Sequence, residues 1–295
     1  MLCIWIAKRN RLVYTSLMKR KKRKPRSKAD IITGVLYVIF GILVAGVLYG
    51  VGRGVYALMG VTVGNHYYAT LAEKAAPADT VDFALLAKEN PEVRGWVRLP
   101  DTAINLPIVK TTDNEFYLDH LFNENSNKLG TPFIDAGNIG DFSDRHTVIY
   151  GHALKSGSMF GSFWEYENPN YFMRNPEIQL FLPDGTQKTL LVFACSRVEG
   201  VRASIPIAFD DENAFLSYID SLVSVSAFSS NVKITAYDRI VSFCIVLPDG
   251  GTGRLLVSCK LSDGASTPDA ATIAPVELVT APEQATQAPQ ETPQG

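Results

Sequence analysis

The segments TVIYGHALKSGSMFG (residues 147–161) and RIVSFCIVLPDGGTGRLLVSCKL (residues 239–261) decide the fold, because in both of them short apolar runs end at turn residues. Such runs predict β-strands, and the Pro-Asp-Gly-Gly sequence at 248–251 predicts a turn that folds two strands into a hairpin. Three reactive side chains stand at strand ends: His152, Cys244 and Arg254. We therefore expect a nucleophile, a proton carrier and a permanent cation to meet at one edge of a sheet.

This trio suits acyl transfer. A thiolate attacks a carbonyl carbon, an imidazole protonates the leaving amine, and a guanidinium stabilises the developing oxyanion. Among the cysteines, Cys259 lies five residues from Arg254, so strand alternation puts it on the opposite face in an apolar set. Cys195 follows another apolar run, and Cys3 precedes the hydrophobic segment near the N-terminus. Cys244 remains as the candidate nucleophile, with a further buried thiol as the alternative interpretation.

The histidine segment, YGH at 150–152 followed by GSMFG at 157–161, resembles that of class B sortases. The resemblance covers about residues 81–263 and includes four upstream segments: NPEVRGW at 90–96, PIV at 107–109, NEFYL at 114–118 and GTPFID at 130–135. Class B sortases are membrane-anchored cysteine transpeptidases of Gram-positive bacteria. The resemblance implies that Cys244 is the nucleophile, His152 the acid and base, and Arg254 the oxyanion partner. Arg239 and Arg197 are the alternative cations.

The resemblance also implies the fold class, which is mostly β with added helices: a sortase-type eight-stranded β-barrel with an N-terminal helix and a helix in the loop before the cysteine strand. The residues agree, because short apolar runs alternate with turn residues from 95 to 261. Residues 210–223 are the exception, with Phe215, Ile219 and Leu222 at helical spacing. The resemblance assigns this helix to one wall of the substrate groove, and a surface helix with one apolar face is the alternative.

One departure from the family concerns the residue before the cysteine. Class B sortases usually carry Thr there, whereas this chain has Phe243. With the resemblance in view, we predict substrate contacts at Tyr117, Leu118, Ser242 and Phe243. A phenylalanine in this place narrows the groove, changes the preferred motif or marks weak activity, and the sequence leaves these three outcomes open.

The N-terminal region predicts a membrane anchor. Residues 31–52 are free of charge, and 22 residues at ~1.5 Å per residue reach about 33 Å, enough for a hydrocarbon core of about 30 Å. Residues 8–28 hold eleven Lys or Arg and no acid, so the N-terminus is expected in the cytoplasm and the catalytic part outside the cell. A cleaved signal peptide is the alternative. Met18, just before the densest basic cluster, is an alternative start.

We expect five parts in the chain: a basic cytoplasmic segment at 1–30, a transmembrane helix at 31–52, a juxtamembrane stalk at 53–80, the catalytic domain at 81–263 and a disordered Pro/Ala/Thr/Gln-rich tail at 264–295. The stalk is expected to be a continued helix or a short linker. The catalytic domain should open with a helix over residues 80–89, capped by Asp79 or Thr80 and stopped by Asn90-Pro91.

Taken together, the resemblance implies an enzyme that cleaves a C-terminal sorting motif through a thioacyl-enzyme and transfers the protein to an amine of the cell wall. Its expected partners are a surface protein that bears the motif, a peptidoglycan precursor or other amine acceptor, and the membrane. The alternatives are a pilin-polymerising sortase and a catalytically weak, wall-associated binding module. Residues 31–295 hold 17 basic and 29 acidic residues, which argues against nucleic-acid binding. No cofactor or metal is expected, since no CxxC, HExxH or Gly-rich phosphate loop occurs.

Overall fold

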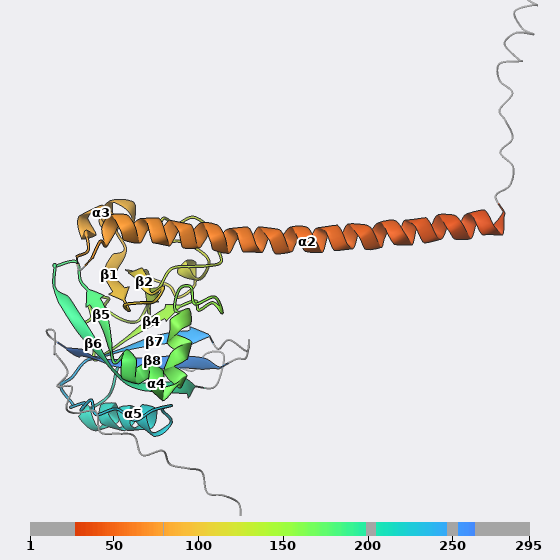
Figure 1. The fold of residues 1–295 in the computed structure, drawn as a ribbon. Helices are drawn as coiled ribbons and strands as arrows, with labels where there is room; N and C mark the ends of the chain where they lie inside the picture. The colour runs from red at the N-terminus through yellow and green to blue at the C-terminus, as the bar shows by residue number, and fades with distance from the viewer. Residues whose placement is uncertain (1–26, 79, 199–204, 247–252, 263–295) are drawn as a thin grey trace, which may run out of the picture. The chain divides into compact units, whose positions relative to one another are not determined.

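The computed structural model describes residues 27–78, 80–198, 205–246 and 253–262 (Figure 1). The chain divides into two compact units, Met1–Leu58 and Met59–Gly295. Most of the predicted cytoplasmic segment, the predicted tail and the turn at 248–251 lie outside the described residues, as do Cys3 and Met18.

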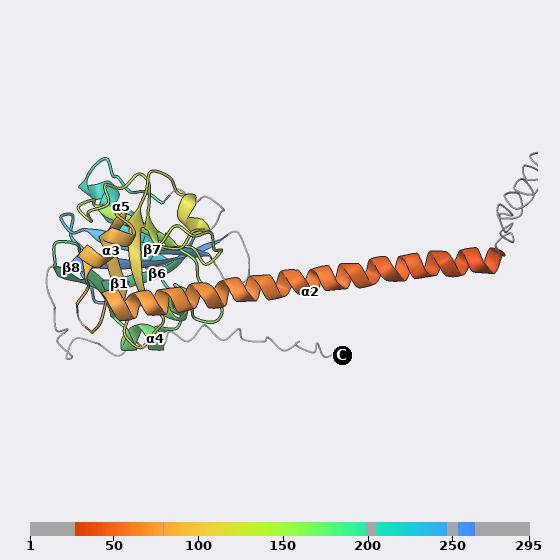
Figure 2. The same cartoon turned by 90° about the horizontal axis from the view of Figure 1, so that it is seen from above.

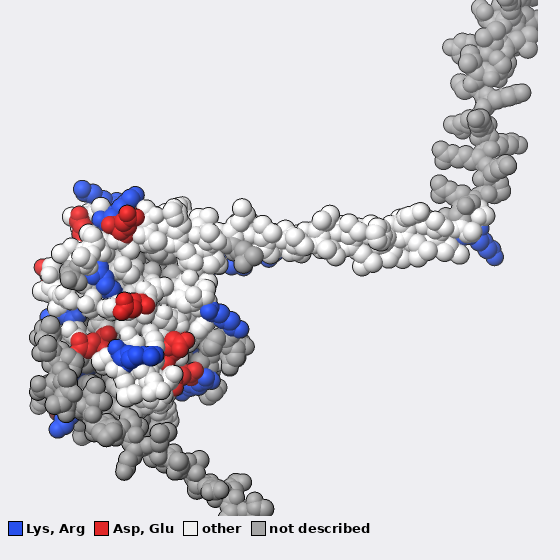
Figure 3. Space-filling view, viewed as in Figure 1, with Lys and Arg blue, Asp and Glu red and all other residues white. Residues whose placement is uncertain are grey.

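Helix α2 (Lys28–Ala75) supplies the described part of the first unit. It is long and apolar enough to cross a membrane by length and composition, and within the described residues its most apolar stretch is exposed. Figure 3 shows this stretch as a surface without charged side chains. Its exposed large apolar residues include Ile31, Ile32, Leu36, Tyr37, Val38, Phe40, Ile42, Leu43, Val47, Leu48, Tyr49 and Val51.

The second unit is built on a barrel closed in the strand order β1-β2-β3-β4-β7-β8-β6-β5 (Figures 1 and 2). Two neighbouring pairs are parallel, β2–β3 and β4–β7, and the others are antiparallel. The predicted eight-stranded barrel is confirmed, and so is the antiparallel pairing of the two strands in residues 239–261. The strands are β1 (Val93–Arg98), β2 (Asn105–Lys110), β3 (Phe133–Ile134), β4 (His146–Gly151), β5 (Glu177–Phe181), β6 (Gln187–Val198), β7 (Ile240–Val246) and β8 (Arg254–Ser262).

Helix α5 (Glu212–Ser224) confirms the helix predicted before the cysteine strand. Asp211 begins it, because its side chain accepts a hydrogen bond from the backbone N–H of Ala214. The apolar stripe predicted from the sequence is the buried face: Phe215, Ile219 and Leu222.

Helix α3 (Phe83–Glu89) is shorter at its start than predicted. Its cap is Asp82, whose carboxylate accepts a hydrogen bond from the N–H of Leu85 at 2.9 Å. Thr80 instead donates its hydroxyl to the carbonyl of Pro77, and Asp79 lies outside the described residues. The predicted stop is correct, since the helix ends at Asn90.

Three short helices were not predicted: η1 (Phe116–Leu118), η2 (Gly161–Glu167) and α4 (Pro169–Arg174). Their segments are too short to show a helical repeat of apolar residues. Helix α2 continues into the predicted stalk, and the end of the helix packs on the barrel, because Tyr68, Leu71 and Ala75 are buried in the same apolar cluster as the barrel interior.

Two apolar clusters share the strands of the barrel. The larger one fills the barrel, and the smaller one lies between α5 and the outer face of β4, β7 and β8. Because side chains alternate along a strand, β7 contributes to both. Val241, Phe243 and Ile245 belong to the barrel interior, while Ile240 and Cys244 belong to the outer cluster.

His146, at the start of β4, is fully buried. Its Nδ1 lies 2.6 Å from the carbonyl oxygen of Pro206 and its Nε2 lies 2.9 Å from Oγ of Ser242. Burial lowers the pKa of the imidazole from 6.5 to about 4, and the bond to Pro206 offsets this only in part. The residue is therefore neutral in the folded protein at neutral pH.

This burial predicts a pH dependence of stability. Between about pH 6.5 and about pH 4 the unfolded chain binds a proton at residue 146 and the folded chain does not, so the free energy of unfolding falls as the pH falls through this range. We expect denaturant unfolding of the full chain in detergent to show a smaller pH slope for His146→Gln than for the wild type. Parallel curves for the two proteins between these pH values would contradict the prediction.

Candidate active site

The strand register brings the expected catalytic residues to one face of the barrel. Tyr150 of β4 pairs with Cys244 of the parallel strand β7, and Arg254 of β8 pairs with Val246. Residues two apart on a strand face the same side, so Cys244 and Arg254 share the outer face. His152 follows Tyr150 by two residues, just beyond the last pair of β4, and so lies at the same end.

Cys244 is a buried thiol, with 4% of its surface exposed. Burial raises its pKa to about 12, because a thiolate is poorly stabilised away from water. The Arg254 guanidinium acts in the opposite direction and the Asp135 carboxylate adds to the increase. The resting side chain is therefore a neutral thiol at physiological pH, and Arg254 is the cation that favours its ionised form.

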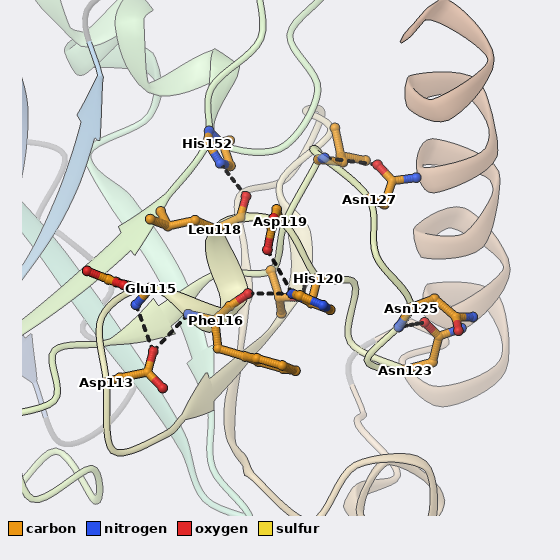
Figure 4. A network of polar contacts seen from close by, with 12 residues as sticks. Asp113, Glu115, Phe116, Leu118, Asp119, His120, Asn123, Asn125, Asn127 and His152 are labelled. Atoms are coloured by element: carbon orange, nitrogen blue, oxygen red, sulfur yellow. Dashed lines mark hydrogen bonds and ion pairs between the residues drawn. The ribbon is translucent and has the colours of Figure 1, made fainter. Parts of the chain in front are cut away.

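His152 has its tautomer set by a backbone carbonyl. Its Nε2 lies 2.7 Å from the carbonyl oxygen of Leu118, as Figure 4 shows. A carbonyl only accepts, so Nε2 carries the hydrogen, and Nδ1 of the neutral ring holds the lone pair. Nδ1 is thus the atom that can take or give a proton in a reaction.

The turn that presents Leu118 is held by local hydrogen bonds. The Asp113 carboxylate accepts from the N–H groups of Glu115 and Phe116, each at 2.8 Å, and these bonds lower its pKa (Figure 4). Gly130 lets this turn approach His152: its φ is +66°, and a Cβ there would lie 2.6 Å from the carbonyl oxygen of Tyr117 and 3.0 Å from Cδ2 of His152. A side chain at residue 130 would push the turn away from the imidazole.

The two alternative cations lie elsewhere. The Arg197 guanidinium forms an ion pair with Glu167, and its strand position, opposite Leu255, faces away from Cys244. Arg239 immediately precedes β7, at the end of the strand remote from Cys244. Of the three arginines, only Arg254 affects the pKa of the Cys244 thiol.

Three of the four predicted substrate contacts are fully buried side chains. The Tyr117 hydroxyl donates to Glu92 at 2.6 Å and accepts from Asn90 at 2.7 Å. Phe243 lies in the barrel with its ring centroid 4.7 Å from that of Phe163. Strand alternation explains this placement, because the residue next to an outward Cys244 must face inward.

Ser242 faces the outer side like Cys244, but it is covered and hydrogen-bonded to other buried side chains. The described contacts of Tyr117, Ser242 and Phe243 are with other parts of the protein and indicate a structural role, while their contact with substrate stays a prediction. Leu118 differs, because 42% of its surface is exposed and its carbonyl holds His152. Of the four predicted substrate contacts, Leu118 is the one whose exposed position suits contact with substrate.

Tyr150 and Asp135 form a polar pair near Cys244 that was not predicted from the sequence. The Tyr150 hydroxyl donates to the Asp135 carboxylate at 2.9 Å, and the Asn114 amide donates to the same oxygen at 3.1 Å. Burial raises the pKa of Tyr150, the negative charge of Asp135 raises it further, and Arg254 lowers it. The signal was present in the sequence, because Tyr150 stands two residues before His152 and so on its face.

No family model matches the chain. The curated relatives that it resembles are both sortase B proteins. Sortase B of Listeria monocytogenes (serovar 1/2a) is 31% identical over 178 residues, which cover 60% of this chain and 72% of that protein. Sortase B of Staphylococcus aureus (strain NCTC 8325) is 25% identical over 181 residues, 61% of this chain and 74% of that protein.

Solved structures show the same fold. Sortase B from Bacillus anthracis, in complex with AAEK1, is 27% identical with a TM-score of 0.63 and covers 70% of this chain and 100% of that one. Clostridium perfringens sortase B is 28% identical with a TM-score of 0.58 over 61% of this chain and 100% of that one. A Staphylococcus aureus sortase B–substrate complex, 22% identical with a TM-score of 0.60 over 68% of this chain and 94% of that one, shares the fold.

The charges around Cys244 predict opposite effects of two substitutions. Arg254→Gln removes the cation and should raise the thiol pKa, while Asp135→Asn removes the anion and should lower it. A shift of one pKa unit changes the thiolate fraction about tenfold. We expect iodoacetamide at about pH 8 to alkylate Cys244 more slowly in the first variant and faster in the second, as followed by mass spectrometry, with Arg254→Lys close to wild type. Equal rates in all four proteins would contradict this.

The buried ring of Phe243 predicts that restoring the family threonine destabilises the barrel. Phe243→Thr leaves a cavity beside Phe160 and Phe163 and buries a hydroxyl, so we expect a loss of about 3–5 kcal/mol in the free energy of unfolding. Phe243→Leu, which keeps an apolar side chain, should lose less. Denaturant unfolding measures both. An unchanged stability together with faster turnover in Phe243→Thr would place this side chain in the groove instead.

Proposed function

Because the chain belongs to the class B sortases, a family of cysteine transpeptidases, we propose that Cys244, His152 and Arg254 are its catalytic residues and that it transfers a surface protein bearing a sorting motif to an amine. One observation supports this proposal: the register puts Cys244 of β7 and Arg254 of β8 on one face of the barrel, and His152 directly follows the end of β4 that pairs with this part of β7. Of the cysteines in the described residues, Cys244 is the one on that face.

In the first half of the reaction, the Cys244 thiol gives its proton to Nδ1 of His152, and the resulting thiolate attacks the carbonyl carbon of the scissile peptide bond in the sorting motif. A sulfur–carbon bond forms, the carbon–nitrogen bond breaks, and protonated His152 gives its Nδ1 proton to the leaving amine. Leu118 keeps the other ring nitrogen engaged through its carbonyl, so the ring stays oriented during the transfer. Arg254 stabilises the oxyanion that develops on the carbonyl oxygen.

In the second half, an amine attacks the thioacyl carbon. Neutral His152 accepts a proton from the amine at Nδ1, the new carbon–nitrogen bond forms, and the Cys244 thiolate leaves. Arg254 again stabilises the oxyanion. A cell-wall amine, on a peptidoglycan precursor, is the acceptor we propose. The alternative of a pilin-polymerising enzyme changes only the acceptor, to a protein lysine.

The binding-module alternative has lost its supporting observation. The feature that supported this alternative is Phe243, which was expected from the sequence to narrow the groove or to mark weak activity. Phe243 is fully buried in the barrel interior, so its ring does not occupy the face that carries Cys244.

Membrane anchoring through α2 completes the proposal. A run of exposed large apolar side chains is costly in water and favourable in lipid, and the apolar stretch of α2 is such a run. The basic residues before it favour a cytoplasmic N-terminus and an extracellular catalytic unit. We assign the anchor to residues 31–52, and we extend the catalytic domain back into the end of α2, because Tyr68, Leu71 and Ala75 join its core.

The experiment that tests the function is trapping of the thioacyl-enzyme. The full chain in detergent is incubated with a library of sorting-motif peptides, and intact mass is followed by peptide mapping. We expect an adduct on Cys244 in the wild type and in Cys195→Ala, whose thiol is buried in the barrel, and no adduct in Cys244→Ala. An adduct that persists in Cys244→Ala, or none on folded wild-type protein with any peptide, would overturn the proposal.

A further inference from the structure

Three buried polar side chains lie on the outer face of the barrel close to Cys244. His146 of β4, Ser242 of β7 and Ser258 of β8 are each fully buried, and Ser242 stands directly opposite Ser258 in the strand register. Ser242 precedes Cys244 by two residues and so shares its face. Polar groups in such a place destabilise a protein unless their hydrogen bonds are made, so the arrangement requires an explanation.

The hydrogen bonds form a chain with a defined direction. The carbonyl of Pro206 can only accept, so Nδ1 of His146 carries the hydrogen of the neutral ring. Nε2 therefore accepts from the Ser242 hydroxyl at 2.9 Å, and Oγ of Ser242 accepts from Ser258 at 2.8 Å. Ser242 thus uses its hydroxyl hydrogen on His146 and is not available to a ligand.

His146 links the cysteine strand to the segment that precedes α5. Pro206 lies between β6 and α5, and its neighbours Ile205 and Ile207 pack on the outer apolar cluster that contains Cys244. The His146 ring also packs on Tyr218 of α5, with ring centroids 5.5 Å apart. The same histidine therefore contacts the loop, the helix and, through Ser242, the strand that carries the thiol.

The segment held in this way covers Cys244. Phe215, Ile219 and Leu222 of α5 belong to the same cluster as the thiol, which is almost completely buried. A movement of this segment would therefore change how far the sulfur is exposed to a substrate carbonyl. The position of residues 205–224 thus decides how open the thiol is and what shape a peptide meets beside it.

We propose that His146 is a positioning residue that fixes residues 205–224 against the cysteine strand through the Pro206 and Ser242 hydrogen bonds, and thereby sets access to Cys244 and the binding of the sorting motif. This inference rests on the proposed function for its effect on the sorting motif. Its effect on access to the thiol stands without it.

The test uses His146→Phe, which keeps an aromatic ring beside Tyr218 and removes both hydrogen bonds. Thr147→Val is the matched control: it is the next residue on the same strand, it is also buried, and its hydroxyl makes no hydrogen bond within the part of the chain that the structure describes. We expect amide hydrogen exchange in residues 205–224 to rise at least tenfold in His146→Phe, with β1, β2 and β5 unchanged. Alkylation of Cys244 by iodoacetamide at fixed pH should also accelerate at least tenfold. Thr147→Val should match wild type in both.

Transfer kinetics in the full chain add the functional readout. A less ordered segment should weaken binding of the sorting peptide more than it slows the chemical step. KM for the peptide should therefore rise about tenfold in His146→Phe, while kcat changes less. Ser242→Ala removes one of the two bonds and should shift all three measurements in the same direction by less. This variant also carries the test if His146→Phe fails to fold.

Two outcomes would overturn the inference. The first is wild-type exchange in residues 205–224 together with wild-type alkylation in folded His146→Phe and Ser242→Ala. The second is exchange that rises equally over the whole barrel, which would indicate general destabilisation. Hydrogen exchange and alkylation need no peptide substrate, so they test this inference even if the chain transfers no peptide. Failure of the proposed function is recognised separately, by the absence of the thioacyl adduct.

Discussion

The site depends on the parallel pairing of β4 with β7 and on the alternation of side chains that this pairing fixes. A single-residue shift of β7 would turn Cys244 into the barrel and Phe243 out to the surface, because the side-chain period of a strand is two. The large ring of Phe243 among Phe160 and Phe163 makes that shift expensive. The aromatic interior of the barrel therefore also holds the thiol on the outer face.

The same arrangement buries the Cys244 thiol, although the proposed reaction needs it as a thiolate. The cluster under α5 protects the thiol and raises its pKa, while Arg254 lowers it. Burial is the larger effect, so the resting thiol is neutral, and the proposed reaction has to begin with its ionisation. The carbonyl of Leu118 and the buried His146 act on the two sides of this site, one by orienting His152 and the other by holding the segment over Cys244.

Much of the site could be predicted from the sequence, because the positions of its main residues follow from patterns within single strands. His152 and Cys244 stand at the ends of short apolar runs, and parity along the strand after residue 253 separated Arg254 from Cys259. The helix at 212–224 showed a clear apolar stripe. Parity predicts that Phe243 faces inward next to an outward Cys244, whereas the resemblance to class B sortases, which usually carry Thr at this place, predicts a groove residue. The roles of Asp135 and His146 depend on contacts between distant segments, across which no periodicity acts.

The proposed chemistry requires that the Leu118 carbonyl holds Nε2–H of His152, so that Nδ1 is the nitrogen that exchanges a proton with Cys244 and the substrate amine. Nitrogen-15 NMR of histidine-labelled protein, before and after alkylation of Cys244, measures this directly. We expect His152 to be the Nε2–H tautomer and His146 the Nδ1–H tautomer, and we expect alkylation to shift the Nδ1 resonance of His152 more than any resonance of His146. A protonated Nδ1 with a bare Nε2 in neutral His152, or a His152 spectrum that alkylation leaves unchanged, would contradict it.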